Sequence, residues 1–303
     1  MPYVLCRMVL NRTPNVRITK QIYDSVKPAK QGIQEIISIE EKFDLMMENY
    51  VELETTLLSL GMSHLAFSTF EYNEMLSSRN LISRRIVNLL SSAILYRDAF
   101  PQHVNNVFGA RHDAAKQLSS ALKDATSLPM PYRMMEAIRN YVQHQELPIE
   151  GIVFDGHKEM DEATRTTKRW AYRVIPKLNA TEVSRRRDLS ADVRTALAAA
   201  GSSIDPTQII REAIEHIGTV HENFRKAIKQ QEEEWDSHLR SLLSKYIKRD
   251  KEKRSYGVAV GFLHSNGTIS DEEYIVQDVL DYRKFLRTKN NSSANLSKRY
   301  VKW

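Results

Sequence analysis

The chain has 303 residues, of which 42% are hydrophobic and 27% are charged, and it carries a formal net charge of +6 at pH 7. These fractions suit a folded protein with an apolar core, and the mildly basic balance is compatible with RNA as a partner without requiring it. Only 10 glycines and 9 prolines argue against a turn-rich β architecture and favour long helices.

The cysteine content and the lack of long apolar runs bound the cellular compartment. Cys6 is the single cysteine, so no disulfide can form within the chain, and a reducing cytoplasm fits best. No run approaches the ~18 apolar residues of a membrane span, and residues 1–14 show no signal-peptide cleavage pattern. We expect a cytoplasmic protein with no membrane partner.

The N-terminal half is patterned for helices after a short start. Residues 1–30 are expected to form an N-terminal segment with a strand over 2–10, and Pro28 suits the first turn of a helix. Apolar residues then recur at helical spacing until Gly61, and Ser63 can cap a following helix. Further helices are expected over Leu81–Tyr96, with a break at Pro101, and over Val104–Leu122. The segment 128–131 is expected to be a linker, followed by a helix that carries Arg139 and stops before Pro148.

The pattern changes after Pro148. An antiparallel pair is expected over Ile149–Phe154 and Lys168–Ile175, with Asp155-Gly156 as a turn signal. One or two short helices should fill 181–200, and Asp205-Pro206 should start a long helix that ends near Arg249. Asn266-Gly267 predicts a hairpin after the strand Tyr256–Leu263, and Ser270 starts either its return strand or a last helix.

These elements predict a mainly α fold. We expect a bundle of about five helices over residues 31–148, with small β-hairpin additions and a long helix in the C-terminal half. Residues 149–303 are expected to pack on that bundle.

One stretch of the bundle, Ile138–His144, gathers the groups that a metal-free ribonuclease needs. Arg139 stays charged and can hold a phosphate in a fork of donors. Asn140 can bind a phosphate, a ribose or a base edge. His144 offers an imidazole, the side-chain group of histidine that can move protons at neutral pH.

Two other Arg–His pairs have similar spacing, as chance alone would supply. Pro101 interrupts the pair Arg97 and His103, and Glu212 follows the arginine of the pair Arg211 and His216. Only Arg139 has a polar carboxamide beside it. Context therefore selects Arg139, Asn140 and His144 as the candidate catalytic residues.

Arg139-Asn140, three residues and His144 together resemble the Arg–polar–x3–His signature of HEPN ribonucleases, over residues 35–148. The resemblance implies a HEPN-like bundle and a metal-independent endoribonuclease. In that chemistry the RNA 2′-OH attacks the adjacent phosphodiester and leaves a 2′,3′-cyclic phosphate and a 5′-OH. His144 would be the general base or acid, Arg139 would stabilise charge in the transition state, and Asn140 would position phosphate or ribose.

The same resemblance implies partners and a biological role. It predicts RNA as substrate, no cofactor, no metal, a homodimer, and an antitoxin or other defence-system partner for a bacterial toxin or antiphage effector. Glu146 stands where some family members carry a tyrosine two residues after the histidine, which weakens the link to the toxin subgroup whose partner modifies that tyrosine.

Helix geometry sets a condition on this site. Residues five apart on a helix are ~500° apart, so Arg139 and His144 diverge by about 140°. Asn140 and His144, four apart, share a face. Either the long arginine reaches round the helix, or a second copy of the helix completes the site across a two-fold dimer.

Basic residues outside the motif are candidates for RNA contact. Arg185, Arg186 and Arg187 form the densest basic run, which is either an RNA-backbone contact or a solvated face. Arg97 can support a phosphate or pair with Asp98. No Cys/His cluster has zinc spacing. Two other readings stay open, namely a helical interaction protein without catalysis and a nucleic-acid-binding module that uses Arg185–Arg187.

Overall fold

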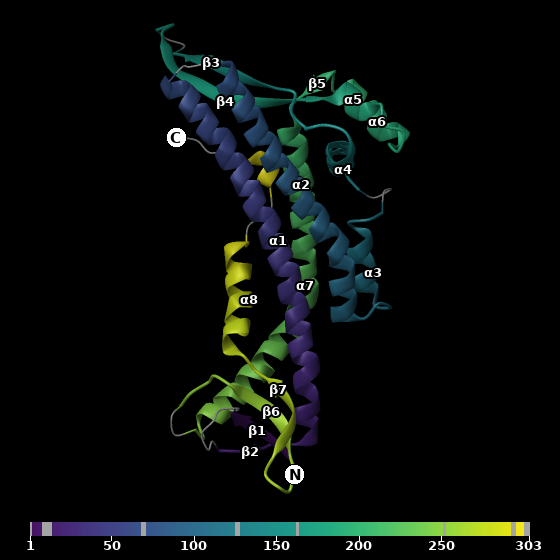
Figure 1. Cartoon of the computed structure of the whole chain (residues 1–303), viewed down its shortest axis with the longest axis vertical. Helices are drawn as coiled ribbons and strands as arrows, with labels where there is room; N and C mark the ends of the chain where they lie inside the picture. The colour runs from purple at the N-terminus through teal and green to yellow at the C-terminus, as the bar shows by residue number, and fades with distance from the viewer. Residues whose placement is uncertain are drawn as a thin grey trace. The chain divides into compact units, whose positions relative to one another are not determined.

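The computed structural model describes residues 2–7, 14–67, 71–124, 128–161, 164–250, 253–291 and 295–299, including all their side chains except those of His157, Arg169, Trp170 and Ala171. Over these residues the protein is mainly helical with small antiparallel sheets, as expected from the sequence (Figure 1).

The helices are α1 (Lys20–Phe67), α2 (Tyr72–Phe108), α3 (Asp113–Ser120), α4 (Met130–His144), α5 (Ala180–Ser184), α6 (Ala191–Ala199), α7 (Pro206–Ile247) and α8 (Gln277–Lys289), with a 3-10 turn η1 (Leu296–Lys298). The strands are β1 (Tyr3–Arg7), β2 (Val16–Arg17), β3 (Gly151–Met160), β4 (Thr167–Asn179), β5 (Ser203–Ile204), β6 (Val258–Leu263) and β7 (Ile269–Tyr274).

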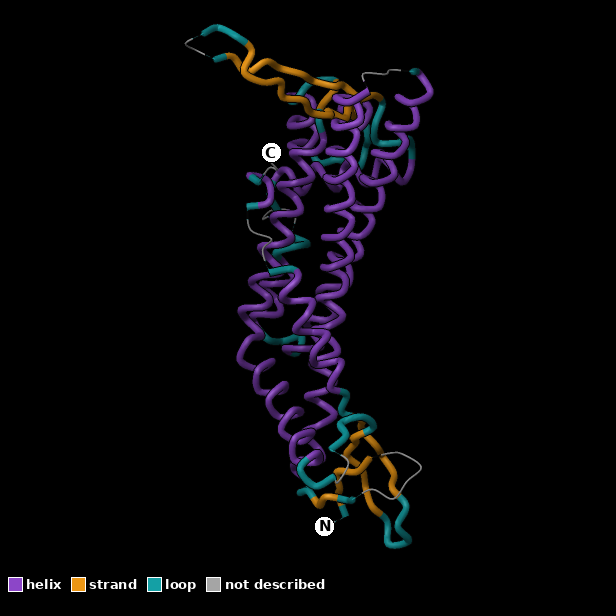
Figure 2. Tube along the Cα trace, turned by 90° about the vertical axis from the view of Figure 1, so that its left-hand side faces the viewer, coloured by secondary structure: helices purple, strands orange, loops and turns teal. Residues whose placement is uncertain are grey.

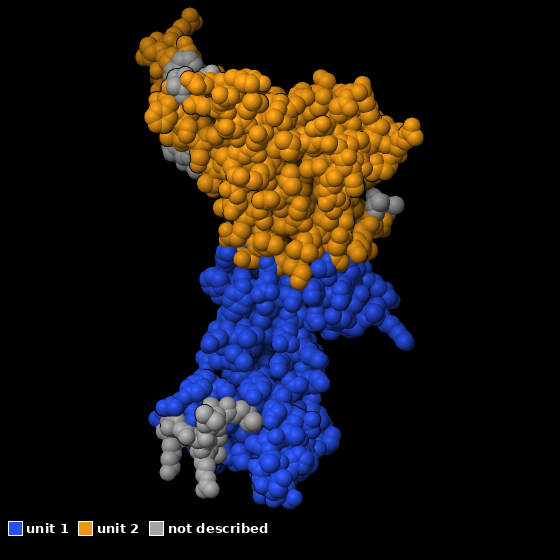
Figure 3. Space-filling view, viewed as in Figure 1, with its two compact units in different colours: residues 1–41, 99–119, 222–291 blue, residues 42–98, 120–221, 292–303 orange. Residues whose placement is uncertain are grey.

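The chain divides into two compact units, coloured separately in Figure 3. Unit 1 comprises residues 1–41, 99–119 and 222–291, and unit 2 comprises residues 42–98, 120–221 and 292–303. The chain passes from one unit to the other within α1, α2, α3 and α7 and again after α8. The expected division into 1–30, 31–148 and 149–303 stays a prediction, because compactness does not show which segment folds alone.

Unit 1 is built around an antiparallel sheet with strand order β2-β1-β6-β7. The expected N-terminal strand is present over Tyr3–Arg7, and residues 8–10 lie outside the described residues. Asn266 and Gly267 form the predicted turn between β6 and β7, and α8 follows the return strand. The sheet contributes Leu5, Val258 and Val260 to a core shared with apolar residues of α1, α7 and α8.

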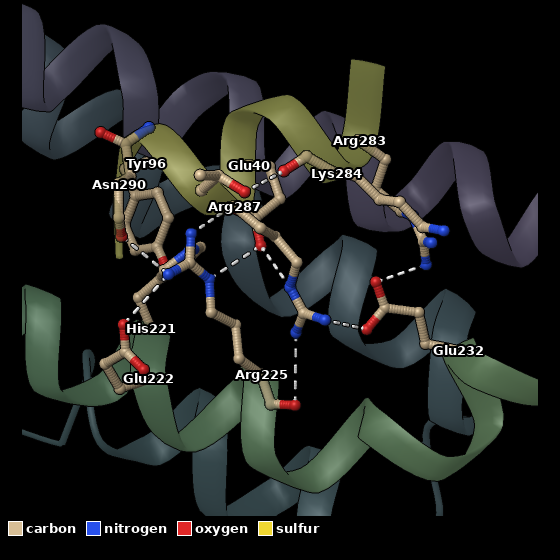
Figure 4. Close-up of polar contacts among 11 residues, drawn as sticks. Glu40, Tyr96, His221, Glu222, Arg225, Glu232, Arg283, Lys284, Arg287 and Asn290 are labelled. Carbon is tan, nitrogen blue, oxygen red and sulfur yellow. Dashed lines mark hydrogen bonds and ion pairs between the residues drawn. The ribbon is translucent and has the colours of Figure 1, made fainter. Parts of the chain in front are cut away.

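Ion pairs join α1, α7 and α8 within unit 1 (Figure 4). Arg225 of α7 donates to both carboxylate oxygens of the fully buried Glu40 of α1, at 2.9 and 2.6 Å. Arg283 of α8 donates to Glu232 and Asp236, at 2.5 and 2.8 Å, and Arg287 also pairs with Glu232. Because these carboxylates are buried, the pairing offsets the desolvation that burial costs.

Unit 2 contains the predicted antiparallel pair as a long hairpin of β3 and β4, which extends past the helices of this unit (Figure 2). β5 pairs with the end of β4. The short helices α5 and α6 and the start of α7 at Pro206 also match the sequence. A buried polar contact lies in the helical core, where the Tyr96 hydroxyl is 3.0 Å from His221 Nδ1 and Phe43 stacks on the imidazole at 3.8 Å.

Three expected helix boundaries are wrong. α1 begins at Lys20, where the Thr19 hydroxyl accepts from Ile22 N–H, so Pro28 lies inside the helix. Gly61 and Ser63 also lie inside α1, which continues to Phe67. A single proline can be carried within a helix when packing on either side compensates for the lost hydrogen bond.

The expected break at Pro101 is wrong for the same reason. α2 passes through Pro101 between the buried Phe100 and Val104. It ends instead before Gly109, whose φ of +88° is the left-handed conformation that glycine adopts easily at a helix end. Buried apolar neighbours thus decide the helix length more than the proline does.

The expected turn at Asp155-Gly156 is also wrong. Both residues lie within β3, where Asp155 pairs with Arg173 and Gly156 pairs with Tyr172. The Tyr172 ring lies so close that a Cβ on residue 156 would be 2.9 Å from it. Glycine serves here for close cross-strand packing instead of a turn.

Candidate active site

Helix α4 positions the candidate residues by burying its opposite side. Pro131 stands in the first turn, where a missing N–H is tolerated. The buried side of the helix consists of Tyr132, Met134, Met135, Ala137, Ile138 and Tyr141. Arg133, Asn140 and His144 lie seven and four residues apart, so they share one side of the helix.

The Arg139 guanidinium bends toward this polar side. Its Nη1 donates to Asn140 Oδ1 at 3.0 Å, and Arg139 forms no ion pair with a described residue. The Nε of Arg139 is buried and has no hydrogen-bond acceptor among the described residues. The buried Nε is out of reach of a ligand, whereas Nη2 forms no hydrogen bond with a described residue and is the nitrogen left for a phosphate.

His144 is the last residue of α4 and is exposed to solvent. It forms no hydrogen bond or ion pair with a described residue, although its charge is felt by a carboxylate nearby. The pKa of Asp188 is lowered, chiefly by hydrogen bonds from Arg186, and charge on His144 acts in the same direction.

Asp188 was missed by the sequence analysis. Arg186 holds it with two hydrogen bonds, at 2.9 and 2.7 Å, and also donates to the Asn140 backbone carbonyl at 2.9 Å. The loop after α5 is thereby attached to α4. The nearest sequence signal is the position of Asp188 directly after the basic run, but the contact joins residues 46 apart and cannot be derived from local spacing.

The basic run divides into three environments. Arg186 is only 10% exposed and serves within the fold. Arg185 is exposed and pairs with Glu182, one helical turn earlier. Arg187 is exposed and forms no ion pair with a described residue. Arg97 is engaged by Glu136 and by Asp98, so the structure shows the expected pairing with Asp98 plus one longer-range pairing.

The other two Arg–His pairs have partners elsewhere. Arg211 is held by both oxygens of Glu54, each at 2.7 Å. His216 Nε2 lies 3.0 Å from the Ala121 carbonyl, and burial lowers its pKa. His103 Nδ1 lies 2.5 Å from Glu35 Oε2. These contacts explain those residues without catalysis.

A cavity of about 430 Å³ opens beside Asn140 in unit 2. Apolar and charged side chains both contribute to it, from α2, α4, the segment after α3, the α5–α6 loop and the start of α6. The lining includes Leu122, Leu128, Ala137 and Val193 as apolar residues and Arg97, Asp98, Lys123, Arg133, Glu136, Asn140 and Asp188 as polar ones. Glu136 and Arg133 share the polar side of α4 with Asn140, a spacing that sequence reasoning could have used.

Two searches of the described residues bear on cofactors and membranes. No group of three or more His, Cys, Asp or Glu side chains is placed there to hold a metal ion. No helix within the described ranges has the length and apolar character of a membrane span.

Comparisons of the chain with models of protein families, with curated proteins and with solved structures found no match. The candidate site therefore rests on its own geometry.

Proposed function

We propose that the protein is a metal-independent endoribonuclease of HEPN type, with Arg139, Asn140 and His144 at its active site. One observation carries the proposal. The Arg139 guanidinium is bonded to Asn140, and His144 lies one turn further along the same side of α4, exposed and without an ion pair among the described residues. A phosphate binder and a proton-transfer group thus stand beside the same carboxamide.

The chemistry follows from the roles of these groups. The RNA 2′-oxygen attacks the adjacent phosphorus and loses its proton, while the 5′-oxygen leaves and takes one up. His144 accepts or donates one of these protons. Arg139 stabilises charge on the phosphorane-like transition state, and Asn140, to which it is hydrogen-bonded, orients the phosphate or ribose.

Two proton transfers need two groups, which favours a homodimer. One imidazole cannot be base and acid in the same step, so a second copy of α4 would supply the other His144. Sedimentation equilibrium tests this arrangement, and a fully active monomer would remove it. An antitoxin or defence-system partner, and a cytoplasmic location, belong to the same proposal.

The decisive experiment uses RNA, EDTA and a modified substrate. Purified protein should cleave single-stranded RNA in EDTA and leave a 2′,3′-cyclic phosphate and a 5′-OH. It should not cleave the same RNA with a single 2′-deoxy substitution at the cut position, because the nucleophile is then missing. Cleavage at the 2′-deoxy position, or a 5′-phosphate product, would mean that water is the nucleophile and that the proposal is wrong.

Binding without cleavage would favour a different function. The exposed Arg187, which has no carboxylate partner among the described residues, is suited to a phosphate contact in a nucleic-acid-binding module. Neither binding nor cleavage would favour a helical interaction protein.

A further inference from the structure

The cavity beside Asn140 has the size and lining of a site for a small flat ligand. Its volume of about 430 Å³ falls within the ~300–1,000 Å³ of small-molecule sites. Leu122, Ala137 and Val193 are at most 3% exposed and give it apolar walls. Charged and amide groups lie among these walls, so a ligand with a flat apolar face and a polar edge suits it.

Two carboxylates offer acceptor oxygens to such an edge. Arg97 binds Asp98 through Oδ1 and Glu136 through Oε1. The second oxygen of each, Asp98 Oδ2 and Glu136 Oε2, accepts no hydrogen bond from a described residue. Because one arginine holds both side chains, these two acceptors are fixed in place before a ligand arrives.

Asn140 adds a donor to the same cavity. Its Oδ1 accepts from Arg139, and this hydrogen bond assigns the amide so that Nδ2 is the end left for a ligand. The cavity thus presents two carboxylate acceptors and one amide donor. The lining also includes a third carboxylate, Asp188, which Arg186 already holds through both oxygens, and the cations Lys123 and Arg133.

We infer that this cavity binds the guanine base of an RNA nucleotide next to the cleaved phosphate. Guanine carries two neighbouring donors, N1–H and the N2 amino group, and the acceptor O6 on one edge, which is the complement of the cavity. Adenine has one donor group on that edge, and the N3–H of uracil stands between two carbonyls that carboxylates repel. Unstacked bases of single-stranded RNA are recognised through such edges.

The inference rests on the proposed function in taking the ligand to be part of RNA. It adds that the enzyme cleaves next to guanosine, because Asn140 belongs both to the cavity and to the candidate catalytic group. Arg139 then links base recognition to phosphate binding by fixing the Asn140 amide.

The test measures binding of GMP, inosine monophosphate, AMP and UMP by isothermal titration calorimetry. All four carry the same phosphate and ribose, so their affinity ratios report the base alone. GMP should bind about tenfold more tightly than inosine monophosphate, which lacks the N2 amino group, and more tightly still than AMP and UMP. Equal affinities, or no binding of any of the four, would overturn the inference.

A pair of variants localises the effect. In Asp98→Asn the amide oxygen can still accept from Arg97, and the amide nitrogen then replaces the free acceptor by a donor. This variant should lose most of the preference for GMP over AMP. Asp155→Asn, an exposed aspartate of the β3–β4 hairpin that also pairs with an arginine, should leave that preference unchanged. An unchanged preference in Asp98→Asn would overturn the assignment of the cavity.

Cleavage mapping on RNA of mixed sequence separates the two proposals. Cleavage without a guanosine preference, together with equal monophosphate affinities, overturns the inference and leaves the ribonuclease standing. Selective binding of GMP without cleavage of any RNA supports the cavity assignment and contradicts the ribonuclease.

Discussion

The buried charges of unit 1 all have ion-pair partners, whereas two cations of α4 in unit 2 have none among the described residues. In unit 1, Glu40 and Glu232 are almost fully buried, and Arg225, Arg283 and Arg287 pair with them (Figure 4). Around α4, Arg139 and His144 have no ion-pair partner among the described residues. A buried charge is costly once its partner is removed, whereas a cation without an ion-pair partner remains able to act on a ligand.

Removing Arg139 or His144, which have no ion-pair partner among the described residues, should have the largest effect, and that effect is on RNA cleavage. Arg139→Ala and His144→Ala should each lower the rate of RNA cleavage by about 10²–10⁴-fold, since charge stabilisation and proton transfer are lost. The free energy of unfolding of His144→Ala should change little, because His144 is exposed, and that of Arg139→Ala should fall by about 1 kcal/mol with the hydrogen bond to Asn140. Cleavage rates and urea denaturation of the same samples measure both quantities.

The exposed His264 of unit 1 provides a matched control. His264→Ala should cleave RNA like the parent. If His144→Ala also cleaves at the parental rate, the catalytic assignment fails and the contrast between the two regions loses its functional meaning.

Breaking the buried ion pairs of unit 1 should lower the free energy of unfolding and leave RNA cleavage unchanged. Arg225→Ala leaves the buried Glu40 without its two-pronged partner, and the expected loss is about 3–5 kcal/mol in the free energy of unfolding. Arg185→Ala, which breaks an exposed pair with Glu182, should cost about 0–1 kcal/mol. Urea midpoints distinguish them, and equal losses would show that burial of the network is unimportant.

Arg186 and Arg187 allow the same comparison between a paired and an unpaired arginine within one loop of unit 2. Arg186→Ala removes its hydrogen bonds to Asp188 and to the Asn140 carbonyl and should cost about 1–3 kcal/mol. Arg187→Ala should change stability by less than about 0.5 kcal/mol. It should instead weaken RNA binding and reduce the slope of log affinity against log salt by about 0.7. If Arg187→Ala lowers stability and Arg186→Ala weakens RNA binding instead, the structural role belongs to Arg187 and the RNA contact to Arg186.

The smallest expected effect concerns pH. Burial lowers the pKa of His216 below its ordinary value near 6.5. As pH falls below that value, the unfolded state binds a proton that the folded state still refuses, so the free energy of unfolding decreases toward pH 5. His216→Asn should show a weaker decrease over the same range in urea denaturation. A decrease equal to that of the parent would assign the pH dependence to other groups.

Local sequence signals predicted the elements that depend on local chemistry. Asp205-Pro206 starts α7 and Asn266-Gly267 forms the hairpin turn, because capping and turn conformations are properties of a few adjacent residues. Pro28 and Pro101 do not end helices as their local sequence predicts, since their neighbours are buried in packing that the local sequence does not display. The helix α8 followed the return strand, where the sequence left both readings open.

The sequence by itself determined that Arg139, Asn140 and His144 occur together at the end of one helix, because their spacing is local. Only the tertiary structure decided which cations are already engaged. Arg97 meets Glu136 across 39 residues, and Arg186 meets the Asn140 carbonyl across 46. Such pairings depend on how segments distant in the chain pack together, and that same packing leaves the cavity beside Asn140 with two acceptors and a donor.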